Sequence, residues 1–436
     1  MTDPMPSPVI AYCGMTHLGL VSGIAAAAKG FDTILFDPDA DLIGRIRGRE
    51  LAGKLHGVEL PVSEPDLDAT YVANRNRITV TADPADLARA DVVYLAPDVP
   101  TDDSGTSDLS AVEELLAVVA PAIGEAATLV ILSQVPPGFT RGIKGVRGPL
   151  YYQVETLVFG IALHRALEPE RYIVGCGDPE APLPAAMRTY LEAFGCPILP
   201  MRYESAELAK ISINMCLVAS VGVANTMAEL CEHVGADWSE IAPALKLDRR
   251  IGAYSYLAPG LGLAGGNLER DLATVMRLGA AHKTDTGIVK AWVENSAWRK
   301  GWAARAVKAR VLDGNPSARV AVLGLAYKQD THSTKNSPSL ALLAELTDVD
   351  VVVHDPVVPA SAAPIAVESA DGPMAAVTGA DALCIMTPWS PYKALDPRQI
   401  ADAMRGRVVL DPYRVLDEKD ALAAGLDYVT LGVTRN

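Results

Sequence analysis

The chain has 436 residues, of which 50% are hydrophobic and 21% are charged, and its formal net charge is −15. This length exceeds one typical folding unit, so we expect two or three domains of an ordinary globular protein. The acidic balance argues against non-specific nucleic-acid binding, which needs basic surface to displace counterions.

The sequence also indicates whether the protein enters a membrane, which compartment it occupies and whether it binds a metal. We find no apolar stretch of the roughly 20 residues that a bilayer requires, and the polar, proline-rich start does not resemble a signal peptide. The six cysteines are scattered without C-x-x-C pairs, and the histidines are isolated. This pattern is typical of reduced thiols, and it predicts a cytoplasmic protein with no membrane partner, no disulfide framework and no metal site.

The first 37 residues read as strand, glycine turn, helix and strand. An apolar run over 9–13 ends at Gly14, a helical pattern covers 18–29, and a second apolar run over 33–36 ends at Asp37. Glycine at the turn and an acid at the end of the second strand are typical of a dinucleotide-binding βαβ unit.

The rest of the chain repeats this pattern around a helical middle. Apolar runs at 91–96 and 128–132 predict further buried strands of a parallel sheet covered on both faces. Helical periodicity fills 205–235 and 268–307. A second strand-glycine-helix pattern then begins, with strands expected at 318–323, 350–354, 382–386 and 408–410. The predicted fold is α/β, with two doubly wound domains around a helical spine.

The first turn is the candidate cofactor site, and its residues are Gly14, Met15, Thr16, His17, Leu18 and Gly19. Thr16 stands where the usual fingerprint has a glycine that lets the backbone approach the pyrophosphate. Asp37 can accept hydrogen bonds from a ribose diol and repel a 2′-phosphate, which favours NAD over NADP. Arg45 and Arg47 keep NADP open, and a Rossmann domain without a dinucleotide is a further alternative.

A glycine-rich segment at 259–271 carries the strongest motif. It reads PGLGLAGGNLERD and is similar to the G-F-G-G-S-C-F-P-K-D signature of the UDP-glucose/GDP-mannose dehydrogenase family. Other segments resemble motifs of that family in the same order: 64–67 (EPDL), 99–101 (VPT), 108–110 (DLS), 133–138 (SQVPPG), 153–160 (QVETLVFG), 207–210 (ELAK), 248–252 (DRRIG), 324–328 (GLAYK) and 336–338 (NSP). The chain therefore resembles this family over almost its whole length.

The resemblance implies a domain plan, a cofactor and a substrate class. It implies an NAD-binding Rossmann domain over 1–200, a central helical dimerisation domain over 201–314, and a Rossmann-like nucleotide-sugar-binding domain over 315–436. It also implies an NAD-dependent reaction at an alcohol of a nucleotide sugar, with UDP-sugars favoured, in a homodimer that forms through the central helices.

Site residues follow from the positions that match the family's motifs. Those matching the catalytic pocket are Glu155, Lys210, Asn214, Asn267 and Asp271. Besides the first turn and Asp37, the expected cofactor contacts are Thr101, Ser133, Gln134 and Lys335. The expected substrate contacts are Arg250, which would reach across the dimer, Tyr256, Gly262, Gly265 and Lys328.

At three of the matched positions the chain lacks a residue that the family is expected to use in oxidising an aldehyde to an acid. Asn267 stands at the position of the nucleophilic cysteine, Gln134 replaces a threonine that orients water, and Phe159 replaces a second glutamate. An amide cannot form the thiohemiacetal through which such an enzyme oxidises an aldehyde to an acid. We therefore expect a two-electron oxidation. An epimerase that oxidises its substrate transiently and a binding protein without turnover remain open.

Overall fold

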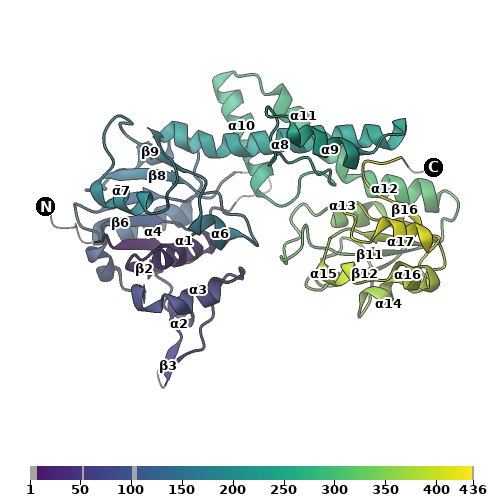
Figure 1. Cartoon of the computed structure of the whole chain (residues 1–436), viewed down its shortest axis with the longest axis horizontal. Coiled ribbons are helices and arrows are strands. Elements are labelled where there is room, and N and C mark those ends of the chain that lie inside the picture. The colour runs from purple at the N-terminus through teal and green to yellow at the C-terminus, as the bar shows by residue number, and fades with distance from the viewer. Residues whose placement is uncertain (1–6, 52–53, 101–105, 435–436) are drawn as a thin grey trace. The chain divides into compact units, whose positions relative to one another are not determined.

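The computed structural model describes residues 7–51, 54–100 and 106–434. The chain divides into two compact units, Met1–Ile213 and Asn214–Asn436. The boundary falls inside one long helix, α8 (Tyr203–Val234), which begins in the first unit and continues into the second (Figure 1).

The first unit is built on an eight-stranded sheet. Its strands are β1 (Ile10–Cys13), β2 (Thr33–Phe36), β5 (Ile78–Thr81), β6 (Val92–Leu95), β7 (Thr128–Ile131), β8 (Leu150–Val154), β9 (Tyr172–Cys176) and β10 (Ile198–Arg202). They lie in the order β10-β9-β8-β7-β6-β1-β2-β5. The helices of this unit are α1 (His17–Ala28), α2 (Ala40–Arg47), α3 (Leu67–Ala73), α4 (Ser110–Ala122), α5 (Phe139–Gly142), α6 (Ala162–Leu167) and α7 (Ala185–Glu192). A short hairpin, β3 (Arg49–Leu51) and β4 (Lys54–His56), lies outside this sheet.

The central strands of the sheet, β1, β2, β6 and β7, are buried on both faces, as their apolar sequences require. All four residues of β1 are buried. Successive side chains of a strand point to opposite faces, so Ile10 and Tyr12 join one core cluster while Ala11 and Cys13 join the other.

The second unit combines helices with a six-stranded parallel sheet. After α8 come α9 (Trp238–Leu247), α10 (Asn267–His282), α11 (Gly287–Lys300) and α12 (Trp302–Val307). The strands are β11 (Arg319–Leu323), β12 (Asp350–His354), β13 (Glu368–Ser369), β14 (Ala382–Ile385), β15 (Val408–Leu410) and β16 (Asp427–Val429), in the order β13-β12-β11-β14-β15-β16. The helices that accompany them are α13 (Pro338–Glu345), α14 (Pro373–Val377), α15 (Ser390–Lys393), α16 (Pro397–Ala403) and α17 (Glu418–Ala423).

Both sheets have the 3-2-1-4-5-6 order of a doubly wound dinucleotide fold, and the first is extended by two strands. The predicted α/β class with two Rossmann-like halves is confirmed. The three predicted domain ranges stay a prediction.

Two details of the sequence prediction are wrong. The first sheet is not wholly parallel, because β8 and β9 pair antiparallel. An apolar run predicts burial but carries no signal for strand direction. The helical stretch predicted over 268–307 is three helices, with breaks at Lys283, whose φ is +56°, and at Gly301.

Helix α8 also corrects the expectation about apolar stretches. Within the described residues it is the one helix long and apolar enough to cross a membrane, with a mean hydropathy of 1.5 over an 18-residue window that is 33% buried. Its polar side chains make specific contacts, since Asn214 binds Asp271 and Asn225 accepts a hydrogen bond from the Gly260 amide. Core helices of globular proteins meet the same criterion, so length and composition alone do not assign this helix to a bilayer.

Candidate active site

The first glycine turn is closely packed against the edge of the sheet. Gly14 has φ of +97°, and a Cβ there would lie 2.9 Å from the Pro97 nitrogen. A Cβ on Gly19 would lie 2.1 Å from the Gly14 carbonyl oxygen. Both positions therefore require glycine, and together they bring the N-terminus of α1 close to the carboxyl ends of β1 and β6. Thr16 fills the middle position and donates its hydroxyl to the Ala96 carbonyl at 2.9 Å.

Asp37 lies at the end of β2 and faces this turn. One carboxylate oxygen accepts the Met15 amide at 2.8 Å, and the other accepts the Asp39 amide at 3.0 Å. A carboxylate oxygen can accept two hydrogen bonds, so Asp37 keeps capacity for a ribose diol. The unpaired amides at the start of α1 are suited to a pyrophosphate. These residues fit the adenosine and pyrophosphate parts of NAD.

His17, which is a predicted cofactor contact, binds a buried acid through its side chain. Its Nε2 lies 2.8 Å from an oxygen of the buried Glu64, and its ring lies 4.1 Å from that of Phe159. Glu64 also accepts the amides of Gly160 at 2.9 Å and of Ala162 at 3.3 Å. The side chain of His17 therefore fastens the segment that contains Phe159 to the start of α1. Glu64 is not among the predicted site residues, although it lies in the motif at 64–67.

Glu155 and Lys210 meet in the first unit. The Lys210 Nζ donates to the backbone carbonyl of Glu155 at 2.9 Å, and the Glu155 carboxylate accepts the Thr156 amide at 2.6 Å. Burial raises the pKa of Glu155, while the Thr156 amide and Lys210 oppose that change. A carboxyl group with a raised pKa is suited to proton transfer nearer neutral pH.

The segment from Ser133 onward is tied down by a second buried acid. Ser133 donates its hydroxyl to the Pro97 carbonyl. Glu207, whose side chain is buried, accepts the amides of Gly138 at 2.5 Å and Thr140 at 2.9 Å. Helix α5 is only four residues long. Gln134 follows Ser133 in this segment, whereas Thr101 lies outside the described residues.

Asn214 and Asp271 meet in the second unit. Asn214 Nδ2 donates to Asp271 Oδ2 at 2.6 Å, and Arg270 Nε lies 3.2 Å from Asp271 Oδ1. Asp271 is 1% exposed and Arg270 is 7% exposed. Asn267 is exposed at the first position of α10, one turn before Asp271 on the same helix. The structure therefore places Asn267 one turn from a buried, fully oriented carboxylate. Arg270 is not among the predicted site residues.

The glycine-rich segment is docked on the loop that precedes α13. The Gly265 amide donates to the Lys335 carbonyl at 3.0 Å, and Asn336 Nδ2 donates to the Gly265 carbonyl at 2.9 Å. Asn336 also binds Glu269. Gly262 and Gly265 have φ of +84° and +81°, and a Cβ on Gly265 would lie 3.1 Å from the Tyr327 ring. The segment therefore has little freedom to move relative to this loop.

The remaining predicted substrate residues lie at the surface of the second unit. The Arg250 side chain is 88% exposed and binds Asp248 at 2.6 Å. Tyr256 is 49% exposed. The Lys328 ammonium lies 5.7 Å from the centre of the Tyr327 ring. Within the described residues no group of three or more His, Cys, Asp or Glu side chains is arranged to hold a metal ion.

The six-stranded sheet of the second unit also has a strand-glycine-helix turn, after β11. There the acid that follows the neighbouring strand is already occupied by hydrogen bonds from the protein. Gly324 has φ of +96°, and a Cβ there would lie 2.4 Å from the Thr387 Cβ. Asp355 follows β12 as Asp37 follows β2, but it accepts five hydrogen bonds, from the amides of Leu325, Ala326, Val357 and Val358 and from the Trp389 indole. Although burial opposes them, these amides hold the pKa of Asp355 below its ordinary value.

Family models match three consecutive parts of the chain. They describe the UDP-glucose/GDP-mannose dehydrogenase family's NAD binding domain over 9–192, its central domain over 204–297 and its UDP binding domain over 321–418. The chain belongs to this family. It is an NAD-dependent oxidoreductase of the kind that acts on a CH–OH group of a nucleotide sugar.

Individual relatives match the chain from end to end. A putative UDP-glucose 6-dehydrogenase, YtcA of Bacillus subtilis, is 27% identical, with 98% of this chain and 99% of the relative covered. The UDP-glucose 6-dehydrogenase of Rickettsia typhi is 28% identical, with 97% and 99% covered. A solved UDP-glucose dehydrogenase from Pyrobaculum islandicum is 26% identical, with a TM-score of 0.82 and both chains fully covered. A dehydrogenase for UDP-D-ManNAc from Pyrococcus horikoshii shares the fold, with a TM-score of 0.77 at 24% identity over 97% and 99% of the two chains.

Proposed function

We propose that this family member oxidises one alcohol of a UDP-sugar by two electrons and stops at the carbonyl. The observation that carries the proposal is Asn267, exposed at the start of α10 one turn before the buried Asp271. Oxidation of an aldehyde to an acid needs a tetrahedral adduct that carries a transferable hydride, and the resemblance to the family implies that a thiolate forms this adduct. The segment 259–271 contains no thiol, and an amide does not replace one.

The groups needed for a single oxidation are present. Such a step removes a proton from the alcohol and a hydride from its carbon, and NAD, when bound, accepts the hydride. Asp271 is held as an oriented carboxylate by Asn214 and Arg270, which suits it to accept the proton, directly or through water. Lys210 supplies positive charge for the developing oxyanion, and it lies one turn before Asn214 on α8.

The substrate class follows from the match of 321–418 to the family's UDP binding domain. The relatives named UDP-glucose 6-dehydrogenase favour a UDP-sugar over a GDP-sugar. Lys328 and the docked segment around Gly265 are the proposed contacts for the nucleotide end.

The test is incubation with NAD and a panel of UDP-, GDP- and dTDP-sugars, followed by mass spectrometry and NADH absorbance. The proposal predicts a product two hydrogens lighter than the substrate and one NADH for each sugar. An epimerase would exchange or invert a sugar position without net NADH, and a binding protein would do neither. A uronic acid with two NADH for each sugar would refute the two-electron limit.

We also propose that the chain forms a homodimer through its central helices. Four apolar side chains at helical spacing are exposed along α8: Val223, Met227, Leu230 and Val234, at 54%, 42%, 48% and 69%. An exposed apolar stripe of this spacing is suited to pack against another helix. In sedimentation, Leu230→Arg should shift the protein toward a monomer, whereas Leu422→Arg, an exposed leucine on α17, should not. Equal behaviour of the two variants would contradict this interface.

The cytoplasm is the proposed compartment. All six cysteines are free, and four of them, Cys13, Cys176, Cys231 and Cys384, are buried. Free thiols are typical of proteins in reducing compartments. Cell fractionation with a tagged protein tests this proposal, and recovery with membranes or in the medium would contradict it.

A further inference from the structure

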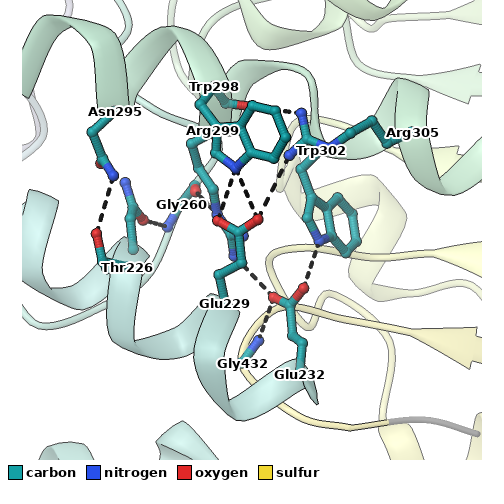
Figure 2. Close-up of polar contacts among 11 residues, drawn as sticks. Thr226, Glu229, Glu232, Gly260, Asn295, Trp298, Arg299, Trp302, Arg305 and Gly432 are labelled. Carbon is teal, nitrogen blue, oxygen red and sulfur yellow. Dashed lines mark hydrogen bonds and ion pairs between the residues drawn. The ribbon is translucent and has the colours of Figure 1, made fainter. Parts of the chain in front are cut away.

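A network of charged and aromatic side chains surrounds the buried Arg299 in the second unit (Figure 2). Arg299 is 1% exposed. Its Nη2 donates to Glu232 at 3.0 Å, and its Nε donates to the Gly260 carbonyl at 3.2 Å. Its Nη1 lies 3.5 Å from Glu229. Arg299 therefore fixes two glutamates of α8 in place.

The acceptor atoms of this network are occupied. Glu232 also accepts the Trp302 indole at 3.0 Å and the Gly432 amide at 3.0 Å. Glu229 accepts the Trp298 indole at 2.9 Å (Figure 2). Donors elsewhere in the network consequently have few acceptors left within the protein.

A cleft of about 330 Å³ lies beside this network. The residues that line it include Glu229, Glu232, Trp302, Arg305, Arg310 and Thr430. Its walls come from the last turns of α8, from α12 and the π-helical turn that follows it, and from the end of β16. None of the residues assigned above to the cofactor or the substrate lines it.

Two donors at this cleft lack an acceptor among the described residues. Thr430 is 1% exposed, and its Oγ1 has no hydrogen-bond partner. Arg305 donates through Nη1 to the Trp298 carbonyl at 2.9 Å and stacks 3.9 Å above the Trp298 ring, but its buried Nη2 has no hydrogen bond and lies 3.9 Å from Glu229. Burial lowers the pKa of Arg305, although Glu229 opposes this effect. Buried donors without acceptors are rare in native proteins and point to a missing partner.

We propose that this cleft binds a small oxyanion, a phosphate or the phosphate group of a metabolite, through Arg305 and Thr430. A planar guanidinium with a free N–H is suited to tetrahedral oxyanions, and a hydroxyl donor beside it adds directionality. The local charges balance, with Arg299, Arg305 and Arg310 against Glu229, Glu232 and Asp427. Recognition therefore rests on hydrogen-bond geometry, and the site should prefer phosphate over chloride at equal ionic strength.

Thr430→Val tests the proposal with little structural change. The substitution replaces an unpartnered hydroxyl with a methyl group, so the free protein should be as stable as the wild type or more stable. Thr128→Val is the matched control, because Thr128 is also 1% exposed with an unpartnered Oγ1 but lies in β7, outside the cleft. Arg305→Gln, which removes the guanidinium, is the second variant.

The measurement is calorimetric titration with inorganic phosphate against sodium chloride of equal ionic strength. It is done with NAD and UDP present, so that other phosphate sites are filled. We expect saturable phosphate binding by the wild type and by Thr128→Val. In Thr430→Val and Arg305→Gln it should be weaker by at least about tenfold, the loss expected for one hydrogen bond to a charged group. No saturable binding by the wild type, or equal binding by Thr430→Val, would overturn the proposal.

Discussion

Asn214 donates a hydrogen bond of 2.6 Å to the Asp271 carboxylate, which is 1% exposed. The two residues lie 57 positions apart, on α8 and α10. With Arg270 on the other oxygen, this contact fixes the direction of a buried negative charge one turn from Asn267. The carboxylate that we propose as the proton acceptor is thus oriented by an amide and a guanidinium alone.

Asp271 should be needed for both stability and activity. Two substitutions at this position distinguish the two effects. Asp271→Ala removes a buried acceptor of Asn214 and Arg270 and should lower the free energy of unfolding by about 3–5 kcal/mol. Asp271→Asn keeps the shape and should remain folded, with kcat lower by roughly 10²–10⁴ because the proton acceptor is lost. Denaturation curves and NADH rates measure the two effects. A folded Asp271→Asn with an unchanged kcat would contradict the assigned role.

Asn267→Cys should restore little acid formation. A thiol at this position would still lack the threonine and the second glutamate, which are Gln134 and Phe159 in this chain. Phe159 is moreover stacked on His17, so its side chain has a structural use of its own. The uronic acid yield and the NADH count for each sugar measure the result, with Asn267→Ser as the control without sulfur. Substantial uronic acid from the single cysteine variant would refute this explanation.

The elements predicted from the sequence were those with local signals. The strands before Gly14 and Asp37 could be located because apolar runs end at turn residues. The antiparallel β9 could not, because its direction depends on how the chain returns to the sheet. In the site, the family motifs pointed to Asn214 and Asp271, but no local pattern marked Arg270 as the partner of Asp271 or Glu64 as the partner of His17. A contact between residues that are far apart in the sequence leaves no recognisable pattern in the sequence around either residue.

Asp37→Ala should weaken NAD binding more than it changes turnover. It removes the ribose acceptor and the partner of the Met15 amide, and a hydrogen bond to a charged group is worth about 1.5–3 kcal/mol. The KM for NAD should therefore rise roughly 10- to 100-fold, and the preference for NAD over NADP should fall. Asp39→Ala is the control, since Asp39 caps α2 and should affect stability by about 1 kcal/mol. An unchanged KM in Asp37→Ala would contradict the proposed cofactor contact.

Stability should respond to pH in opposite directions at two glutamates. Burial raises the pKa of Glu155 above its ordinary 4.5, so its favourable contribution is lost as pH rises from 4.5 through the raised value. Glu155→Gln should therefore gain stability relative to the wild type over that range. The Arg141 hydrogen bond lowers the pKa of Glu204 to about 2, so Glu204 stabilises the fold above pH 4.5 and loses this effect below it. Denaturant midpoints of Glu155→Gln and Glu204→Gln, measured from pH 2 to 7 against the wild type, test both trends, and parallel curves for the two variants would disagree with them.

Glu232→Ala should be strongly destabilising. It removes the acceptor shared by Arg299, Trp302 and Gly432 and leaves a guanidinium that is 1% exposed without its nearest carboxylate. The expected loss is about 3–5 kcal/mol. Glu294→Ala, whose exposed ion pair with Lys290 spans 3.8 Å, should change stability by less than about 0.5 kcal/mol. Urea denaturation compares them, and similar midpoints would show that the buried network is dispensable.

Asp355 sets a limit on stoichiometry. The chain carries the strand-glycine-helix design twice, yet in the C-terminal copy the strand-end carboxylate is saturated by five donors from its own fold. No lone pair on that carboxylate remains for a ribose, whereas Asp37 retains some. The second copy of the design therefore adds no second NAD site, and equilibrium dialysis should saturate at a single NAD for each polypeptide.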